Sequence, residues 1–342
     1  MIKQAISNLA DKRHLTEGEA EAAMTQIMAG EATPAQIGAF LIGLRLNGET
    51  VPEIVGCARA MRASALKVVC RRTDLVDTCG TGGDGSGTFN ISTTVALVAA
   101  GAGLGVAKHG NRSVSSRCGS ADLLEGLGVS LDLGPEEIAR CIDTVGIGFL
   151  FAQRLHPAMK NAGGPRRELG TRTIFNLLGP LTNPASAEVQ LIGVYSPDLT
   201  EPLAQVLRTL GTKQALVVHG HGGLDELSTT GVNRVTRLKD GEITTFQLDP
   251  AEFGLPLSQP EELKGGSAEE NVKITRELLE GKKGPRRTIV LLNAAAILVT
   301  AGAASDYRSG MALAADVIDK GKARDKLGEL VRLSQSMVKK HA

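Results

Sequence analysis

Residues 74–108 read DLVDTCGTGGDGSGTFNISTTVALVAAGAGLGVAK, and this stretch decides the fold. Its first six residues predict a short strand that runs into a glycine-rich loop. Residues 92–101 predict a helix, and residues 105–107 predict a second strand, which delivers Lys108. A strand, a helix and a strand in this order form a βαβ unit. We therefore expect an α/β fold with a central, mostly parallel sheet.

The loop of this unit indicates a phosphate site. Five of the eight residues from Gly80 to Gly87 are glycine, a residue used where φ is positive or where a ligand approaches the main chain closely. Free N–H groups in such a loop, followed by the positive end of a helix, bind anions. The segment 108–112 (KHGNR) adds a lysine, which is a point charge for a phosphate. We expect these two segments to form two walls of one site for a multiply phosphorylated small molecule.

The glycine loop also matches G-x-G-x-x-G, the fingerprint of dinucleotide sites. Such sites have an acidic residue about 20 positions further on, which binds the ribose. In this chain no acidic residue follows the loop until Asp122. The chain has no G-x-x-x-x-G-K-[ST] sequence, which argues against a P-loop nucleotide site. A plain flexible loop is the third alternative, and the polar residues beside the glycines disfavour it.

Two carboxylates form a candidate metal site. Asp225 and Glu226 follow a predicted strand at 215–219 and a glycine-rich turn. Mg²⁺ is commonly bound by one or two carboxylates together with substrate phosphates, although a solvated acidic turn is the alternative. His219 and His221 lack other ligands at matching spacing, so we expect them to be hydrogen-bonded or exposed.

A pair of arginines, Arg166 and Arg167, follows a Gly-Gly-Pro sequence. The guanidinium fork matches a carboxylate or a phosphate bidentately. The alternative is an ion pair with Glu168 or another surface acid, and we expect that outcome for Arg167.

The composition narrows the class of protein. The 342 residues are 42% apolar and 22% charged, with a formal net charge of +1. The lack of a basic excess argues against nucleic-acid and membrane-surface partners. Five scattered cysteines without a C-x-x-C pair fit a reducing compartment. The start of the chain has no apolar signal segment and no run is long enough to span a bilayer, so we expect a cytoplasmic location.

Capping boxes organise the N-terminal part. Thr16 with Glu19, Thr33 with Gln36, and Thr50 with Glu53 predict three helix starts. We expect a small all-helical domain over residues 1–67, completed by about 156–184. A larger α/β domain is expected over 68–155 and 185–342.

Beyond the βαβ unit, the sequence predicts further elements. These are strands at 189–195 and 215–219, three short strands within 227–248, and helices at 119–127, 288–301 and 309–320, with another helix opening at Gly134-Pro135.

The motifs in this order resemble those of the anthranilate phosphoribosyltransferases of tryptophan biosynthesis, which share a fold with nucleoside phosphorylases. The most specific matches are 77–84 (DTCGTGGD), 88–93 (TFNIST), 108–112 (KHGNR) and 172–184 (RTIFNLLGPLTNP). The resemblance covers almost the whole chain. It implies transfer of a phosphoribosyl group from phosphoribosyl diphosphate to the amine of anthranilate, with Mg²⁺ as the cofactor.

The resemblance also implies roles for individual residues. Phosphoribosyl diphosphate is expected to bind at Gly80, Gly83, Asp84, Thr88, Asn90, Ile91, Ser92, Thr93, Lys108, Asn111, Arg112, Ser113, Ser116 and Ser120. Anthranilate is expected at Gly80, Asn111 and Arg166, and Mg²⁺ at Ser92, Asp225 and Glu226. Lys108 and Asp84 are the expected catalytic residues. Members of the family are homodimers that associate through the small helical domain.

Two other functions are compatible with such a fold. Pyrimidine nucleoside phosphorylases have a similar Lys-His loop, but theirs continues as Lys-His-Ser, whereas here Gly110 and Asn111 follow. A nucleic-acid-binding relative that has lost catalysis would show a basic face and an eroded site. The near-zero net charge and the intact motifs disfavour it.

Overall fold

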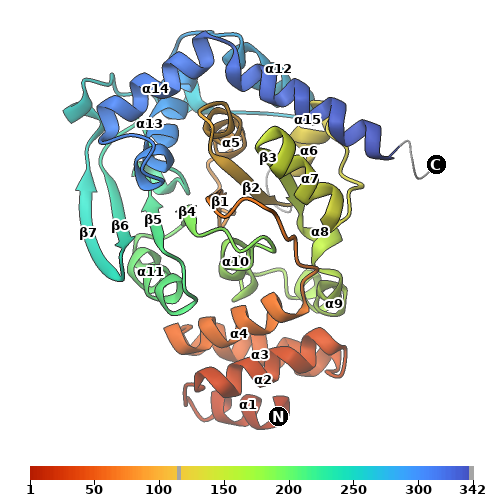
Figure 1. The fold of residues 1–342 in the computed structure, drawn as a ribbon. Coiled ribbons are helices and arrows are strands. Elements are labelled where there is room, and N and C mark those ends of the chain that lie inside the picture. Colours follow the sequence, from red (N-terminus) through yellow and green to blue (C-terminus); the bar gives the residue numbers. More distant parts are fainter. Residues whose placement is uncertain (114–116, 339–342) are drawn as a thin grey trace.

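The computed structural model describes residues 1–113 and 117–338, in which a helical subdomain lies below a larger α/β part (Figure 1). Seven strands of this described part form one sheet in the order β3-β2-β1-β4-β5-β6-β7. Their bounds are β1 (Leu75–Gly80), β2 (Gly105–Gly110), β3 (Ile147–Phe151), β4 (Val189–Gly193), β5 (Gln214–His219), β6 (Asn233–Lys239) and β7 (Glu242–Leu248). Neighbours from β3 to β5 are parallel, and only the β5-β6-β7 edge is antiparallel. The expected α/β fold with a mostly parallel sheet is confirmed.

The helices fall into the N-terminal group α1–α4 and the helices of the α/β part. Their bounds are α1 (Ile2–Ala10), α2 (Glu17–Ala29), α3 (Pro34–Asn47), α4 (Val51–Ser64), α5 (Ile91–Gly101), α6 (Ser120–Gly126), α7 (Pro135–Val145), α8 (Ala152–Leu155), α9 (Lys160–Leu169), α10 (Phe175–Leu178), α11 (Thr200–Thr209), α12 (Ala268–Leu279), α13 (Pro285–Thr300), α14 (Tyr307–Asp319) and α15 (Lys322–Val338).

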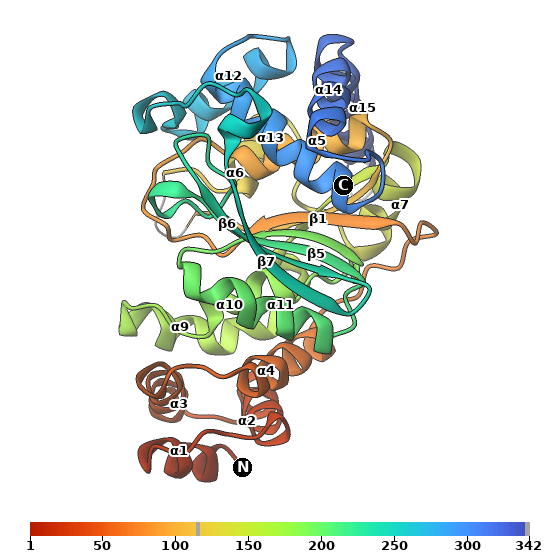
Figure 2. The ribbon, with the colours of Figure 1, turned by 90° about the vertical axis from the view of Figure 1, so that its left-hand side faces the viewer.

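The sheet is covered on both faces. Figure 2 shows α10 and α11 below it and α5 and α13 above it. Alternate residues of a strand point to opposite faces, so along β4 Leu191 joins the upper hydrophobic cluster and Ile192 the lower one. The lower cluster continues without a break into the core of α1–α4, where Phe40 and Leu44 are fully buried. The helical subdomain and the lower face of the sheet therefore share one core.

The helix starts in the subdomain follow the predicted caps. The side chains of Thr16 and Thr33 each accept a hydrogen bond from the backbone N–H of the residue three positions on. In return, the side chains of Glu19 and Gln36 accept from the backbone N–H groups of the two threonines. Glu53 accepts from the Thr50 backbone at 2.8 Å, completing the third box. Two orphan N–H groups are satisfied at each start, which fixes where the helix begins. Helix α9, from residues 160–169, packs against α2 and α3 of this group.

Three sequence expectations are corrected here. Residues 227–248 contain two strands, β6 and β7, rather than three, because the segment before Asn233 is held by turns and side-chain hydrogen bonds. Strand β3 was not predicted, since its fully buried run of five residues lacks the period-2 pattern. Strand β2 extends to Gly110, so Lys108 lies within the strand and not after it.

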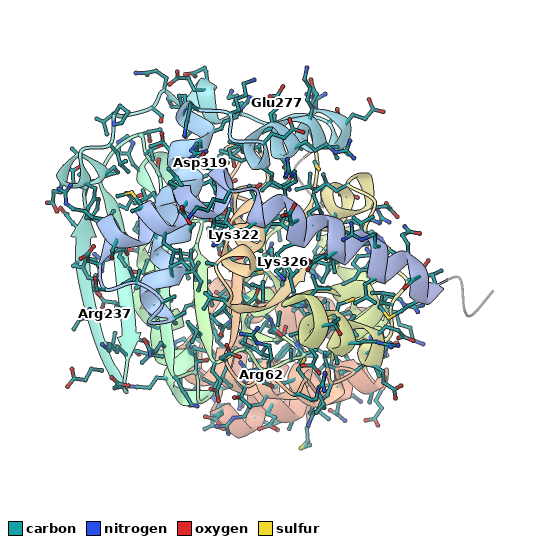
Figure 3. All side chains as sticks on the ribbon, turned by 45° about the horizontal axis from the view of Figure 1, so that its top comes forward. Arg62, Arg237, Glu277, Asp319, Lys322 and Lys326 are labelled. Carbon is teal, nitrogen blue, oxygen red and sulfur yellow. The ribbon has the colours of Figure 1, made fainter. Side chains whose placement is uncertain are left out.

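The top of the molecule is polar. Glu277 of α12, Asp319 at the end of α14, and Lys322 and Lys326 of α15 lie on this face (Figure 3). Within the described range, no helix has the length and apolar character that crossing a membrane requires.

Candidate active site

The strand order reverses direction at β1, so the carboxyl end of β1 is a topological switch point of the sheet. The chain passes from β1 to β2 on one side, and β4 pairs with β1 on the other. In open α/β sheets, ligands bind outside the carboxyl ends of the strands at this switch point. The glycine loop begins here, and its Thr81 N–H donates to the Gly193 carbonyl at the end of β4.

The glycine loop has a backbone that other residues would strain. Gly82, Gly83, Gly85 and Gly87 have φ values of 69°, 70°, 73° and 65°, in the left-handed region that glycine occupies without penalty. Gly80 serves a different need, because a Cβ there would collide with the Asp225 carboxylate. The loop and the acidic turn after β5 are therefore in direct contact, as two walls of one site require.

Three carboxylates gather between these walls. Asp225 accepts from the Gly82 N–H at 2.7 Å, and its own N–H donates to Asp84 at 3.3 Å. Burial, together with the negative charge of Asp84, raises the pKa of Asp225. Burial and the charge of Asp225 raise the pKa of Glu226. Carboxyls held this close favour the protonated form unless a positive charge lies beside them.

Ser92 completes this acidic cluster. Its N–H, in the first turn of α5, donates to Glu226 at 3.1 Å, and its side chain also bonds that carboxylate. Asn90, just before the helix, donates to the Cys118 carbonyl and accepts from Asn271. Ile91 and Thr93 are 1% exposed, so only their main chain can meet a ligand. Thr88 is half-buried in the loop, 3.3 Å from the Ser86 hydroxyl.

Lys108 reaches the site from below. It is 2% exposed, and its ammonium donates to the carbonyls of Thr78 and His109. Its charge lowers the pKa of Asp77 against the raising effect of burial, which dominates. It also lowers the pKa of Glu226. In this structure Lys108 thus supplies positive potential beneath the carboxylates and not a free ammonium in a loop.

The segment after β2 is tied to α6. The Asn111 carbonyl accepts from the Ser120 hydroxyl at 3.2 Å, and the Ser113 N–H donates to Asp122. Arg112 forms ion pairs with Asp122 and Glu125. Its guanidinium charge is therefore shared with protein carboxylates. Ser116 lies outside the described residues.

Arg166 lies on α9, the helix that packs against α2 and α3. It is half-buried, with its guanidinium 5.0 Å from the centroid of the Phe175 ring. Burial lowers its pKa, and no ion pair to it exists among residues 1–113 and 117–338. Arg167 has none in that range either. The ion pair expected for Arg167 is therefore wrong, because Glu168 is its neighbour on the helix, where adjacent side chains do not face each other.

A buried polar network under β1 and β2 was given no role by the sequence analysis. Asp77 accepts from the His109 N–H and from Asn183, whose amide also bonds the Ala107 carbonyl. His109 Nδ1 donates to the Gly179 carbonyl, and its Nε2 lies 3.3 Å from Nε2 of His156. Burial lowers the pKa of His109 to about 3 and that of His156 to about 4. The one sequence clue was that Asp77, His109 and Asn183 each lie inside one of the matched motifs.

The remaining histidine prediction is confirmed. His219 is hydrogen-bonded to the Val194 carbonyl at 2.8 Å, and the exposed His221 to the Thr230 hydroxyl at 2.9 Å. All five cysteines are free thiols.

Comparisons with known proteins agree with this geometry. Residues 72–324 match the family model "Glycosyl transferase family, a/b domain", and residues 3–65 match "Glycosyl transferase family, helical bundle domain". The anthranilate phosphoribosyltransferase of Moorella thermoacetica is 56% identical over 336 residues, covering 98% of this chain and 99% of that protein.

Solved structures give the same result. The crystal structure of anthranilate phosphoribosyltransferase from Thermus thermophilus has a TM-score of 0.92 at 46% identity, covering 97% of this chain and 99% of that one. The Saccharomyces cerevisiae enzyme, solved with phosphoribosyl diphosphate and Mg, has a TM-score of 0.91 at 27% identity, with 98% of both chains covered. The same yeast enzyme has been solved with 4-fluoroanthranilate. None of these relatives is named as a pyrimidine nucleoside phosphorylase or as a nucleic-acid-binding protein. The chain belongs to the anthranilate phosphoribosyltransferases, within the glycosyl transferase family whose models it matches.

Proposed function

We propose that this chain transfers the 5-phosphoribosyl group of phosphoribosyl diphosphate to the amine of anthranilate, giving N-(5-phosphoribosyl)anthranilate and diphosphate. The observation that carries the proposal is the contact between the glycine loop and Asp225, which joins an anion-binding backbone to a carboxylate cluster at the switch point of the sheet. Membership of the family supports the reaction, and the yeast relative binds both kinds of substrate.

The phosphoribosyl diphosphate site is proposed at the carboxyl ends of β1 and β2. Its residues are Gly80, Gly83, Asp84, Thr88, Asn90, Ile91, Ser92, Thr93, Lys108, Asn111, Arg112, Ser113, Ser116 and Ser120. The loop N–H groups donate to the phosphates and the start of α5 adds its dipole. Lys108 offsets negative charge from beneath, and Asp84 orients Asp225. Lys108 and Asp84 are our proposed catalytic residues.

Mg²⁺ fits the acidic cluster. The donors of Ser92, Asp225 and Glu226 are oxygen atoms, which Mg²⁺ prefers. Burial raises the pKa of both carboxyls, and a cation bound beside them would favour their ionised form. When bound, the ion supplies Lewis acidity to the departing diphosphate.

Anthranilate is proposed to lie between Arg166, Asn111 and Gly80. The half-buried guanidinium of Arg166, which has no ion pair within residues 1–113 and 117–338, suits a carboxylate, which it can hold through two parallel hydrogen bonds. That contact orients the amine toward C1 of the ribose. As the C1–O bond to diphosphate breaks and the C1–N bond forms, the neutral amine supplies the electron pair and loses its proton afterwards. No side chain has to act as a base.

The direct experiment measures diphosphate release with anthranilate, with and without Mg²⁺. Release that needs both is expected. Replacing Asp225→Asn together with Glu226→Gln should reduce turnover and shift the Mg²⁺ optimum upward. An unchanged Mg²⁺ dependence in that variant would remove the metal assignment, and no release by the unmodified chain would remove the function.

The assembly and the domain limits are further proposals. We propose a cytoplasmic homodimer that associates through the helical domain of residues 1–67, completed by about 156–184, with 68–155 and 185–342 forming the α/β domain. Leu46 of α3 supports this surface, because it is a large apolar side chain left 69% exposed. Sedimentation should show a dimer, and Leu46→Glu should shift it toward monomer. A monomeric unmodified chain would contradict the proposal.

A further inference from the structure

Arg172 connects three parts of the molecule. It lies in the segment between α9 and α10, and its Nη2 donates to the carbonyl of Gly83 in the glycine loop. Its guanidinium stacks over the ring of Tyr195, 4.1 Å from the centroid, just beyond β4. Its own carbonyl accepts from Arg45 of α3, with an Nη1–O distance of 2.5 Å.

The glycine loop needs such an anchor. Four of its glycines have positive φ, a conformation that glycine adopts easily and also leaves easily, because it has the largest backbone freedom in the unconstrained state. Asp225 holds the Gly82 N–H, and Gly265 donates to the Gly87 carbonyl at 2.9 Å. The hydrogen bond from Arg172 ties the loop to the segment between α9 and α10.

The stack on Tyr195 restricts where the guanidinium can lie. A guanidinium over an aromatic face gains a cation–π attraction and loses rotational freedom. Arg172 forms no ion pair within residues 1–113 and 117–338, so no carboxylate in that range draws it away. Burial raises the pKa of Tyr195, the charge of Glu49 adds to the rise, and the charges of Arg172 and Arg45 oppose it.

We infer that Arg172 is a positioning residue for phosphoribosyl diphosphate: it holds Gly83 in the conformation that presents the loop N–H groups, and through Arg45 it couples this loop to the helical subdomain. The expected effect on the KM for phosphoribosyl diphosphate rests on the proposed function. The anchoring of the glycine loop by Arg172 rests on geometry alone. Arg172 acts here through the main chain of the loop and not through the reacting atoms.

The kinetic test uses Arg172→Gln. The KM for phosphoribosyl diphosphate should rise about tenfold, the scale of one charge-assisted hydrogen bond, while kcat and the KM for anthranilate change little. Arg172→Lys keeps the charge and loses the planar fork. Its KM for phosphoribosyl diphosphate should therefore lie between those of the unmodified chain and Arg172→Gln. Arg45→Ala should shift the same KM in the same direction by less.

Arg308→Ala is a matched control. Arg308 is also exposed, stacks 6.0 Å from the centroid of Phe253, and donates to the carbonyls of Glu252 and Phe253. Like Arg172, it stacks on an aromatic ring and donates to backbone carbonyls, but these carbonyls belong to residues 252 and 253, outside the proposed site. Its variant should leave all three kinetic constants as they are.

Hydrogen exchange separates the inference from the proposed function. Without any substrate, the amides of residues 82–87 should exchange faster in Arg172→Gln than in the unmodified chain, with the rest of the sheet unchanged. If exchange and the KM for phosphoribosyl diphosphate both stay the same, or if only kcat falls, the inference is overturned. If the unmodified chain shows no turnover, the proposed function fails while the exchange result still decides on the anchor.

Discussion

At the scale of single residues, the site contrasts cations that have carboxylate partners with cations that do not. Arg112 is paired with two acids, whereas Arg166 is half-buried beside an aromatic ring and has no such partner in the described part of the chain. A desolvated charge without a partner is costly, and in the proposed function the carboxylate of anthranilate would become the partner of Arg166.

Arg166→Ala should raise the KM for anthranilate by about ten- to a hundredfold, the cost of losing a charged, bidentate contact. The effect on the KM for phosphoribosyl diphosphate should be small. Arg167→Ala is the control, since its side chain is exposed one position along the same helix. Steady-state kinetics with both substrates varied will show the difference. A loss that falls on phosphoribosyl diphosphate would mean that Arg166 is misplaced.

The buried pair of His109 and His156 leads to a prediction about how the free energy of unfolding depends on pH. The folded chain keeps His156 neutral down to a pKa of about 4, against an ordinary value of 6.5. Below pH 6.5 the unfolded chain therefore binds a proton that the folded chain rejects. The free energy of unfolding should fall as the pH drops from 6.5 toward 4, by at most about 1.4 kcal/mol per pH unit for this group.

Denaturant unfolding at several pH values measures that slope. His156→Asn removes the titrating group, so its slope over this window should be shallower than that of the unmodified chain, whatever its stability at pH 8. Equal slopes would contradict the assignment.

At the scale of elements, the active site depends on close approach between two loops. Gly80 ends β1 at the point where the Asp225 carboxylate passes. Gly82, two positions on, has open space around the position of a Cβ but a φ of 69°. The two glycines are therefore needed for different reasons, one steric and one conformational.

Gly80→Ala should displace the Asp225 carboxylate and weaken Mg²⁺ activation by more than about tenfold, which corresponds to 1.4 kcal/mol. Gly82→Ala should cost folding stability by about 1 kcal/mol through backbone strain and disturb Mg²⁺ activation less. Mg²⁺ titrations of activity, alongside unfolding curves, compare the two variants. Equal Mg²⁺ effects would show that the contact at Gly80 is unimportant.

Local signals made much of this fold predictable. The capping boxes at Thr16 and Thr33 and the strand–glycine loop–helix order act over a few residues, so the sequence displays them directly. The pairing of Asp84 with the Asp225 backbone joins positions 141 apart, and it depends on β4 lying between β1 and β5. Composition and spacing do not encode that adjacency. The inward position of Lys108 follows likewise from where β2 ends, which sequence predicts poorly.

At the scale of the whole molecule, the helical subdomain is fastened to the α/β part by polar as well as apolar contacts. Arg62, near the end of α4 at the lower part of the view in Figure 3, donates from Nε to the Leu181 carbonyl at 2.7 Å and from Nη1 to the Leu210 carbonyl at 3.4 Å. Burial lowers its pKa. One side chain thus joins α4 to the segment after α10 and to the end of α11.

Arg62→Ala should lower the free energy of unfolding by about 1.5–3 kcal/mol, the usual value for hydrogen bonds to a charged group. Arg140→Ala, an exposed arginine of α7, is the control and should change it by less than about 0.5 kcal/mol. Urea unfolding measures both. Similar small losses in the two variants would show that the fastening at Arg62 contributes little.

The shared lower core has a consequence for the order in which a ribosome makes this chain. The first 64 residues emerge early, yet the apolar partners of their sheet-facing side include Leu178, Leu207 and Val217. Those partners are synthesised more than a hundred residues later. The nascent helices must therefore wait with apolar surface uncovered, which is when chaperones have the most to bind.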